Sequence, residues 1–155
     1  MVANGVLIYN DLKGREVLIR AINVCNDYII MKEKVEFTKK FAAVVWRDIR
    51  EAGAEKWTAV ISFYDEALAK IPGYKGLIYA KPPGRVVEAK KLNCLLVLPR
   101  YTLATEKAIS LAHKLGMYVV AWTVNDPTVA LNLWKRGVDG IATDDLEAVK
   151  PTKPP

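Results

Sequence analysis

Basic side chains and one tryptophan follow the apolar strands predicted for this chain, in positions from which they could bind an anion. Because the carboxyl ends of parallel strands meet at one edge of a sheet or barrel, we expect these side chains to converge. Guanidinium and ammonium groups bind phosphate through charge-assisted hydrogen bonds. The candidate anion-binding residues are Lys32, Lys34, Lys81, Arg100 and Trp122. For each basic residue the alternative is a solvated loop charge, and for Trp122 it is a plug in the barrel mouth.

The stretch from Leu111 to Asp145 shows how such residues would be positioned. A glycine ends its first helix, an apolar strand follows, and Pro127 opens a second helix that Gly137 caps. Strands that carry helices on both sides are almost continuously apolar, as this one is. Polar residues close each strand, so Asn125 and Asp144 are expected to point toward whatever site the protein has.

Strand and helix alternate along the chain from residue 28 onward, with short connections. Strands are predicted at about 6–9, 28–32, 59–63, 76–80, 95–98, 117–122 and 139–142. A helix with Thr38 as candidate N-cap and Gly53 at its end precedes the third of these strands. Trp46 and Trp57, near the end of that helix, are expected to pack against the protein rather than to hold a ligand. The alternation predicts an α/β fold with a parallel sheet and right-handed crossovers.

One domain at residues 1–150, with a disordered proline-rich tail at 151–155, is the natural interpretation of 155 residues. The length is short for a full (β/α)8 barrel, which needs roughly 200 residues or more. We therefore expect a TIM-barrel-like fold with an N-terminally shortened or incomplete barrel of about seven strands. Open sheet edges are usually paired or covered, so a homo-oligomer or a closed seven-strand variant is expected.

Composition narrows the class of protein. The chain has 23 basic and 17 acidic residues, for a net charge of +6. Such a surface attracts phosphate esters, nucleic acid or an acidic membrane face, and a merely solvated lysine-rich surface is the alternative. A hydrophobic content of 52% excludes a disordered chain. The chain shows neither a signal peptide nor an apolar run near the roughly 18 residues that span a membrane, which predicts a cytoplasmic protein.

Two further compositional features concern the interior and the habitat. Cys25 and Cys94 are isolated in apolar surroundings, which predicts buried free thiols rather than a disulfide or a metal pair. Glutamine is absent, while lysine, arginine and glutamate are plentiful. That bias suits a thermophile, in which ion-pair networks help and thermolabile amides are disfavoured.

Three segments carry a resemblance to a known family. The run VVAWTVNDP…GVDGIATDD and the segments AVISFYDEAL and TEKAISLAHKLG resemble the C-terminal part of the glycerophosphodiester phosphodiesterase family. The resemblance covers about residues 59–147. It implies a (β/α)8 barrel that hydrolyses glycerol-linked phosphodiesters with a divalent metal, Mg²⁺ or Ca²⁺. It also implies that Trp122 forms a hydrophobic wall for the glycerol moiety.

The catalytic motifs that the resemblance implies are largely missing. The family places two histidines in His-Arg-Gly and His-Asp motifs for acid and base chemistry. The second motif survives here at most as Asn10-Asp11, and asparagine transfers no proton at accessible pH. The one histidine is His113, in the middle of a helix outside the barrel, where we expect a structural role. Displacing an alkoxide near neutral pH needs a proton donor, which this set does not supply.

The family's Glu-x-Lys motif, which implies metal ligands, has two candidate positions. One is Asp11-Leu12-Lys13 and the other is Lys32-Glu33-Lys34, so Asp11 and Glu33 are the candidate metal ligands. Spacing favours the second position, because the interval from Lys34 to Ser62 fits one helix and its loops. A lysine that faces a metal would repel it, so we expect no metal cofactor, with Mg²⁺ or Ca²⁺ as the alternative.

These features predict a degenerate phosphodiesterase-like protein that lacks hydrolase activity and binds a phosphate-containing small molecule or serves as a scaffold. One alternative is an active metal-dependent glycerophosphodiester phosphodiesterase, with a replaced catalytic set or completed by a complementary chain. A second alternative is a nucleic-acid or ribonucleoprotein-associated module, although the basic residues match no known binding motif.

Overall fold

The structure is a computed structural model that describes residues 3–10, 15–22 and 31–149, with side chains described from Lys39 onward. The strands are β1 (Ala3–Asn10), β2 (Arg15–Ile22), β3 (Val60–Ser62), β4 (Lys75–Tyr79), β5 (Leu96–Pro99), β6 (Tyr118–Ala121) and β7 (Gly140–Ala142). The helices are α1 (Met31–Glu51), α2 (Asp65–Leu68), α3 (Val86–Lys91), the 3-10 turn η1 (Tyr101–Leu103), α4 (Glu106–Lys114), α5 (Pro127–Arg136) and α6 (Leu146–Val149). Among the described residues, no helix is long and apolar enough to cross a membrane.

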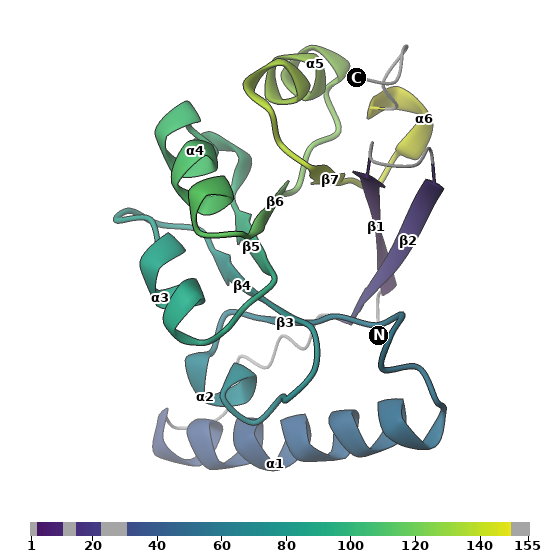
Figure 1. Cartoon of the computed structure of the whole chain (residues 1–155), viewed down its shortest axis with the longest axis vertical. Coiled ribbons are helices and arrows are strands. Elements are labelled where there is room, and N and C mark those ends of the chain that lie inside the picture. Colours follow the sequence, from purple (N-terminus) through teal and green to yellow (C-terminus); the bar gives the residue numbers. More distant parts are fainter. Residues whose placement is uncertain (1–2, 11–14, 23–30, 150–155) are drawn as a thin grey trace.

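The strands form one mixed sheet in the order β2-β1-β7-β6-β5-β4-β3. Strands β3 to β7 are parallel and adjacent in chain order, whereas β1 pairs antiparallel with both β2 and β7. Figure 1 shows the parallel strands following a curve with α2 to α5 outside it and the β1–β2 hairpin across the open side. The chain thus builds successive βα units, as the alternation of strand and helix predicted.

The predicted strand count is wrong in its N-terminal part. The parallel sheet has the strands β3 to β7, five rather than about seven, because the predicted first strand pairs antiparallel as β1. The prediction of a strand at 28–32 is also wrong, since α1 already begins at Met31; residues 28–30 lie outside the described residues. No pairing joins β2 to β3 in the described part of the chain, so a closed barrel is not confirmed.

Local sequence signals explain where the C-terminal helices begin and end. Thr105 is the N-cap of α4 and accepts a hydrogen bond from the Ala108 amide at 3.2 Å. Asp126 caps α5 and accepts from two amides of its first turn, directly before Pro127 at the first helical position. Gly137 ends α5 with φ of +90°, a left-handed conformation that glycine adopts without strain.

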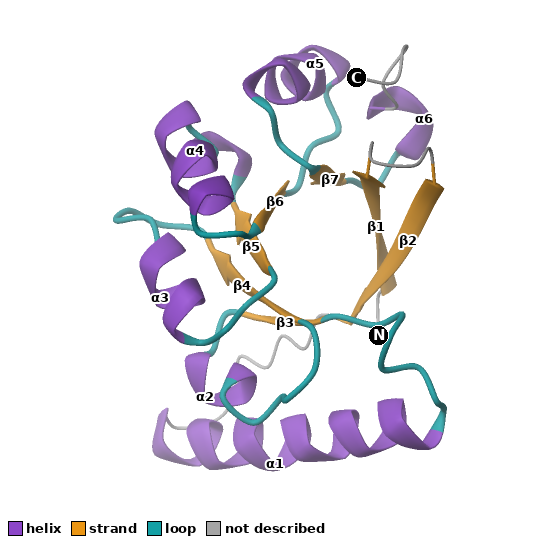
Figure 2. Ribbon diagram, viewed as in Figure 1, coloured by secondary structure: helices purple, strands orange, loops and turns teal. Residues whose placement is uncertain are grey.

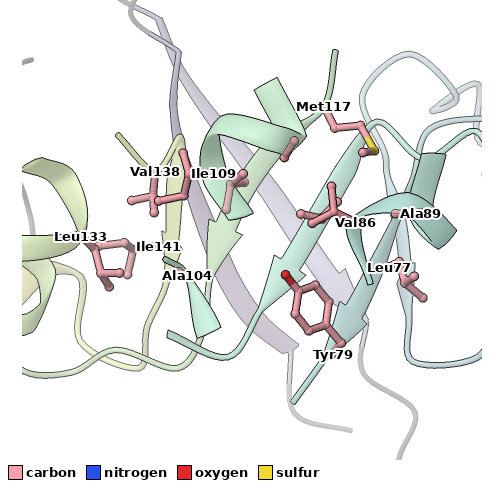
Figure 3. Close-up of a cluster of buried hydrophobic side chains, with 14 of the residues drawn as sticks. Leu77, Tyr79, Val86, Ala89, Ala104, Ile109, Met117, Leu133, Val138 and Ile141 are labelled. Carbon is pink, nitrogen blue, oxygen red and sulfur yellow. The ribbon is translucent and has the colours of Figure 1, made fainter. Parts of the chain in front are cut away.

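Alternate residues of the parallel strands face two different layers. One row points to the helices, where Leu77 and Tyr79 of β4 pack near Val86 and Ala89 of α3 in the larger core cluster (Figure 3). The other row points to the inner, concave side of the sheet and forms a second cluster. That cluster contains Ala59, Ile78, Leu96, Leu98, Val120 and Ala142. The inner row matters for function, because it leads directly to the carboxyl edge of the sheet.

Helix α1 forms an extra layer outside α2, as Figure 2 shows. Trp46 of α1 packs closely against Gly73, where an added Cβ would clash with the indole ring. This contact fits the expected packing role of Trp46. The same prediction is wrong for Trp57, whose side chain is 80% exposed.

Candidate anion site at the carboxyl edge of the sheet

The inner row of side chains continues past the ends of the strands. In β5 and β6, Leu98 and Val120 belong to the inner cluster, and the positions two residues further along are Arg100 and Trp122. Because successive residues of a strand alternate between faces, both positions belong to the inner side at the carboxyl edge. A parallel β-bridge joins Arg100 to Trp122 and extends the ladder by one step. The structure therefore brings these two predicted site residues together.

Hydrogen bonds and one ring contact fix the position of the Trp122 indole. Its Nε1 donates to the Leu98 carbonyl at 2.7 Å, and its backbone carbonyl accepts from the Tyr101 amide at 2.9 Å. The Phe63 ring meets the indole edge to face, with 5.6 Å between centroids and 86° between planes. Both rings remain partly accessible, so they form an apolar wall beside the strand ends.

Arg100 supplies the cation beside this wall. Its side chain is exposed, and no ion pair involves it among the described residues. A guanidinium group presents several fixed donors, which suits a phosphate or a carboxylate. Lys81 is also exposed, in the loop after β4, but its position is one residue out of phase with the inner row. The structure therefore does not unite Lys81 with Arg100 and Trp122.

A polar network closes the same edge after β6 and β7. The Asn125 side chain accepts from the Thr143 hydroxyl and from the Asp144 amide, each at 3.0 Å, and donates to the Asp144 carboxylate at 3.0 Å. Asp145 caps α6 by accepting from the Ala148 amide at 3.2 Å. Asn125 and Asp144 thus lie at the expected edge, where they tie two loops together.

The described residues do not fit the divalent metal that the family resemblance implies. No group of three or more histidine, cysteine, aspartate or glutamate side chains within the described ranges could hold a metal ion. Of the two candidate ligands, Asp11 lies outside the described residues. Glu33 lies in the first turn of α1 rather than at a strand end.

The same correction applies to Lys32 and Lys34. Both were placed at the end of a strand that the structure replaces with α1, so the geometric reason for assigning them to the site is wrong. Phe63, in contrast, was missed as a site residue. The signal was present, because Phe63 lies two residues after Ile61, which packs on the inner cluster. Extending the alternation of β3 would have predicted it.

The one histidine lies at the opposite edge of the sheet. His113 Nε2 is 2.8 Å from Asp139 Oδ2, and the same oxygen accepts from the Val119 amide at 2.7 Å. Asp139 directly precedes β7, and Val119 is near the start of β6. The imidazole therefore helps to join α4 to the amino ends of two strands, away from Arg100 and Trp122.

Several solved structures that share this fold are described as phosphodiesterases. A protein from Silicibacter pomeroyi DSS-3, described as a glycerophosphoryl diester phosphodiesterase, is 22% identical in sequence and superposes with a TM-score of 0.70. The match covers 77% of the present chain and 45% of the Silicibacter pomeroyi chain. A glycerophosphodiester phosphodiesterase from Parabacteroides distasonis is 20% identical with a TM-score of 0.67, and the match covers 81% of the present chain and 52% of that enzyme's chain. A phosphodiesterase from Oleispira antarctica, solved with the product sn-glycerol-3-phosphate, is 19% identical with a TM-score of 0.63. That match covers 74% of the present chain and 49% of the Oleispira antarctica chain.

These similarities are below 25% identity, so they show the fold alone, and this chain spans about half the length of the structures it matches. None of the curated proteins matches the chain. The model of the glycerophosphoryl diester phosphodiesterase family matches residues 13–148, which is most of the sequence. The chain belongs to the glycerophosphoryl diester phosphodiesterase family.

Proposed function

We propose that this chain is a degenerate family member that binds a phosphate-containing small molecule at the carboxyl edge and does not hydrolyse it. The observation that carries the proposal is the position of His113, the one histidine of the chain. It contacts Asp139 at the amino edge. Cleaving a phosphodiester near neutral pH requires proton transfer at the reacting oxygens, for which histidine is the usual group. Arginine and tryptophan at the carboxyl edge cannot take that role.

The binding part of the proposal rests on Arg100, Trp122 and Phe63. The guanidinium group would bind the phosphate, and the two rings would cover the carbon chain of a glycerol-like moiety. The Oleispira antarctica enzyme was solved with sn-glycerol-3-phosphate, which has this combination of phosphate and short polyol. We therefore take sn-glycerol-3-phosphate as the first ligand to test.

A turnover assay tests the catalytic part of the proposal. The purified chain is incubated with glycerophosphocholine and excess Mg²⁺ or Ca²⁺, and release of sn-glycerol-3-phosphate is followed. We expect no release above the rate without protein. Turnover at ordinary enzyme rates, on the order of 1 per second or faster, would overturn the proposal. The turnover would be assigned to the carboxyl edge if the Arg100→Ala variant loses this activity and the His113→Ala variant keeps it.

Calorimetric titration with sn-glycerol-3-phosphate tests the binding part. Replacing Arg100 with alanine removes charge-assisted hydrogen bonds worth about 1.5 to 3 kcal/mol, so the affinity should fall roughly 10- to 150-fold. Arg136→Ala is the matched control, because it removes another exposed arginine at the end of α5. Equal losses of affinity in both variants would indicate a general effect of charge and would contradict a binding site at Arg100.

The length of the relatives supports a second candidate function. Because the chain spans about half of each matching structure, further strands from a complementary chain or segment could complete an active phosphodiesterase. Co-expression with the N-terminal half of the Parabacteroides distasonis enzyme tests this. A stable complex that hydrolyses glycerophosphocholine would favour the second candidate, and a chain that stays inactive and unassociated would favour the first.

A further inference from the structure

The amino edge of the parallel sheet collects basic side chains. Helices α3, α4 and α5 end there, and each carries lysine or arginine in its last turn. Further lysines follow α2 and precede β3. The exposed basic residues of this edge are Lys56, Lys70, Lys90, Lys91, Lys114, Lys135 and Arg136. Cations are favoured at helix C-termini, so each residue has a local reason to be there, and together they give the edge a positive potential.

Hydrogen bonds place these helix ends side by side. Lys90 Nζ at the end of α3 donates to the Leu115 carbonyl at the end of α4, at 2.9 Å. The Leu95 amide donates to the Lys75 carbonyl, and the Tyr118 amide to the Leu95 carbonyl, each at 2.9 Å. These bonds run from the start of β4 across β5 to β6. The basic residues therefore lie along one continuous edge.

Little negative charge opposes them. The described acidic residues nearest this edge in the chain are Glu51 at the end of α1, Glu55, Glu88 within one turn of the end of α3, and Asp139, and Glu51 already pairs with Arg47 at 3.8 Å. Asp139 already binds His113 and the Val119 amide. None of the basic side chains of this edge forms an ion pair among the described residues. Their positive charge is therefore available to a partner.

Two aromatic side chains are exposed at the same edge. Trp57 is 80% exposed in the segment that leads into β3, and Tyr74, directly before β4, is 49% exposed. The Val60 amide donates to the Tyr74 carbonyl at 2.9 Å, which brings the two segments together. Exposing an indole to water is unfavourable, and tryptophan and tyrosine beside lysine are typical of surfaces that meet lipid headgroups.

We propose that the amino edge binds the surface of a bilayer rich in anionic lipids. The lysines supply electrostatic attraction, worth about 1 kcal/mol for each residue near the surface, and Trp57 inserts among the headgroups. Lysine dominates the set, and the residues are spread along an edge. A nucleic-acid site would instead favour arginine in a groove with several stacking rings. The membrane face also leaves the carboxyl edge, with Arg100 and Trp122, open to a soluble ligand.

Vesicle co-sedimentation of the full chain tests the proposal. Vesicles of phosphatidylcholine alone are compared with vesicles that contain phosphatidylcholine and phosphatidylglycerol in equal parts. We expect binding to the anionic vesicles only, and its release at high salt, because screening shortens the range of the attraction. Equal binding to both vesicle types, or binding to neither, would overturn the proposal.

Matched variants on one helix locate the contact. Lys114→Ala, at the amino end of the sheet, should lower the vesicle partition coefficient about fivefold, which corresponds to the loss of about 1 kcal/mol. Lys107→Ala removes the same charge from the first turn of α4 and should change the coefficient less than twofold. Equal losses in the two variants would refute a contact at this edge.

The aromatic contribution and the competing partner are tested separately. Trp57→Ala should lower the partition coefficient at least fivefold, whereas Leu131→Ala, which removes an equally apolar, 49% exposed side chain of α5, should not. A single-stranded RNA of mixed sequence is then titrated by fluorescence anisotropy. RNA binding that Lys114→Ala weakens while vesicle binding stays unchanged would assign the edge to nucleic acid and remove the membrane proposal.

Discussion

The two edges of the parallel sheet differ in charge. The carboxyl edge holds the helix starts, and their caps and first turns are acidic. The acidic residues there are Asp65, Glu66, Glu88, Glu106, Asp126, Asp144, Asp145 and Glu147. The amino edge holds the helix ends and is basic. The macrodipole of each helix favours this arrangement, so the parallel architecture turns a local preference into a charge difference across the whole protein.

The difference changes the meaning of the net charge of +6. From the sequence, that charge suggested an anion pocket at the carboxyl edge, where this family is expected to bind its ligand. The structure assigns most exposed lysines of the βα units to the other edge. Phosphate binding at the carboxyl edge would therefore depend on Arg100 locally, with Arg85 already bound to Asp65 at 2.7 Å.

The largest expected effect concerns Lys75, the buried lysine of the amino edge. Lys75 is 8% exposed, and its Nζ donates to the Leu68 and Ile71 carbonyls at 3.0 and 2.8 Å. Lys75→Met removes both charge-assisted hydrogen bonds, and although the Leu68 carbonyl still accepts from the Ile71 amide, the Ile71 carbonyl loses its buried donor. The free energy of unfolding should therefore fall by about 3 kcal/mol in urea titrations. Lys70→Met, at an exposed position on the same edge, should change it by less than about 0.5 kcal/mol.

This pair of variants separates structure from surface charge at the amino edge. Both remove one lysine, so an electrostatic effect of the whole edge would shift the two stabilities equally. We expect instead that only the buried lysine matters for stability. If Lys75→Met unfolds at the same urea concentration as the parent chain, the buried hydrogen bonds do not stabilise the end of α2.

The next effect compares one polar network from each edge. Asp139 Oδ2 accepts from His113 and from the partly buried Val119 amide, whereas Asn125 bonds the exposed Asp144 and the buried Thr143 hydroxyl, which also has hydrogen bonds to the Asp145 backbone. Asp139→Ala should lower the free energy of unfolding by about 2 kcal/mol and Asn125→Ala by about 1 kcal/mol. Thermal and urea unfolding measure both. The reverse order would show that the carboxyl edge holds the sheet together.

Sequence alone predicted the elements from β3 to β7 well, because their signals are local. The apolar strands, the Thr105 and Asp126 caps and the Gly137 stop each depend on neighbouring residues. The N-terminal third was harder. The apolar run that begins at Tyr28 and turns charged at Lys32 predicts a strand at 28–32. The structure begins α1 at Met31, so the charged residues from Lys32 onward belong to a helix. The helical pattern of the following residues therefore extends further toward the N-terminus than the local composition indicates.

The candidate site was predicted in part. Arg100 and Trp122 were assigned because each lies at or just past a strand end, and the structure shows that each also follows an inner-facing strand residue by two positions. Lys81 was grouped with them because nearness to a strand end was used without the alternation of faces. The basic amino edge was not recognised at all, although lysines in the last turns of the helices are visible in the sequence. Recognising it requires knowing that these helix ends lie side by side.

A pH titration compares two buried acids, one from each edge. Burial raises the pKa of the Cys94 thiol, just before β5, from 9.0 to about 11, and that of the Tyr79 phenol, at the end of β4, from 10.0 to about 12. In both cases the folded state binds the proton more tightly. Each contribution to stability is thus fully present below the unfolded pKa and is lost as pH rises through the folded pKa.

The Cys94→Ala variant isolates the amino-edge contribution. The free energy of unfolding of the parent chain should fall between pH 9 and pH 11 as the thiol titrates. In the Cys94→Ala variant this fall should be smaller, by about 1 to 2 kcal/mol at most. Tyr79→Phe should have the corresponding effect between pH 10 and pH 12, where the Tyr79 phenol titrates. Urea unfolding at each pH measures both. Identical pH profiles for Cys94→Ala and the parent chain would mean that the thiol titrates as it does in the unfolded chain.

The smallest expected effect compares the tryptophans of the two edges. Trp122→Phe loses the hydrogen bond to the Leu98 carbonyl and part of the contact with Phe63, so the free energy of unfolding should fall by about 1 kcal/mol. Trp57→Phe should leave it unchanged within about 0.5 kcal/mol, because the side chain is 80% exposed. A larger loss for Trp57 would mean that the indole stabilises the fold. If stability is unchanged, any vesicle-binding defect of a Trp57 variant reports on the surface itself, since the fold does not need that indole.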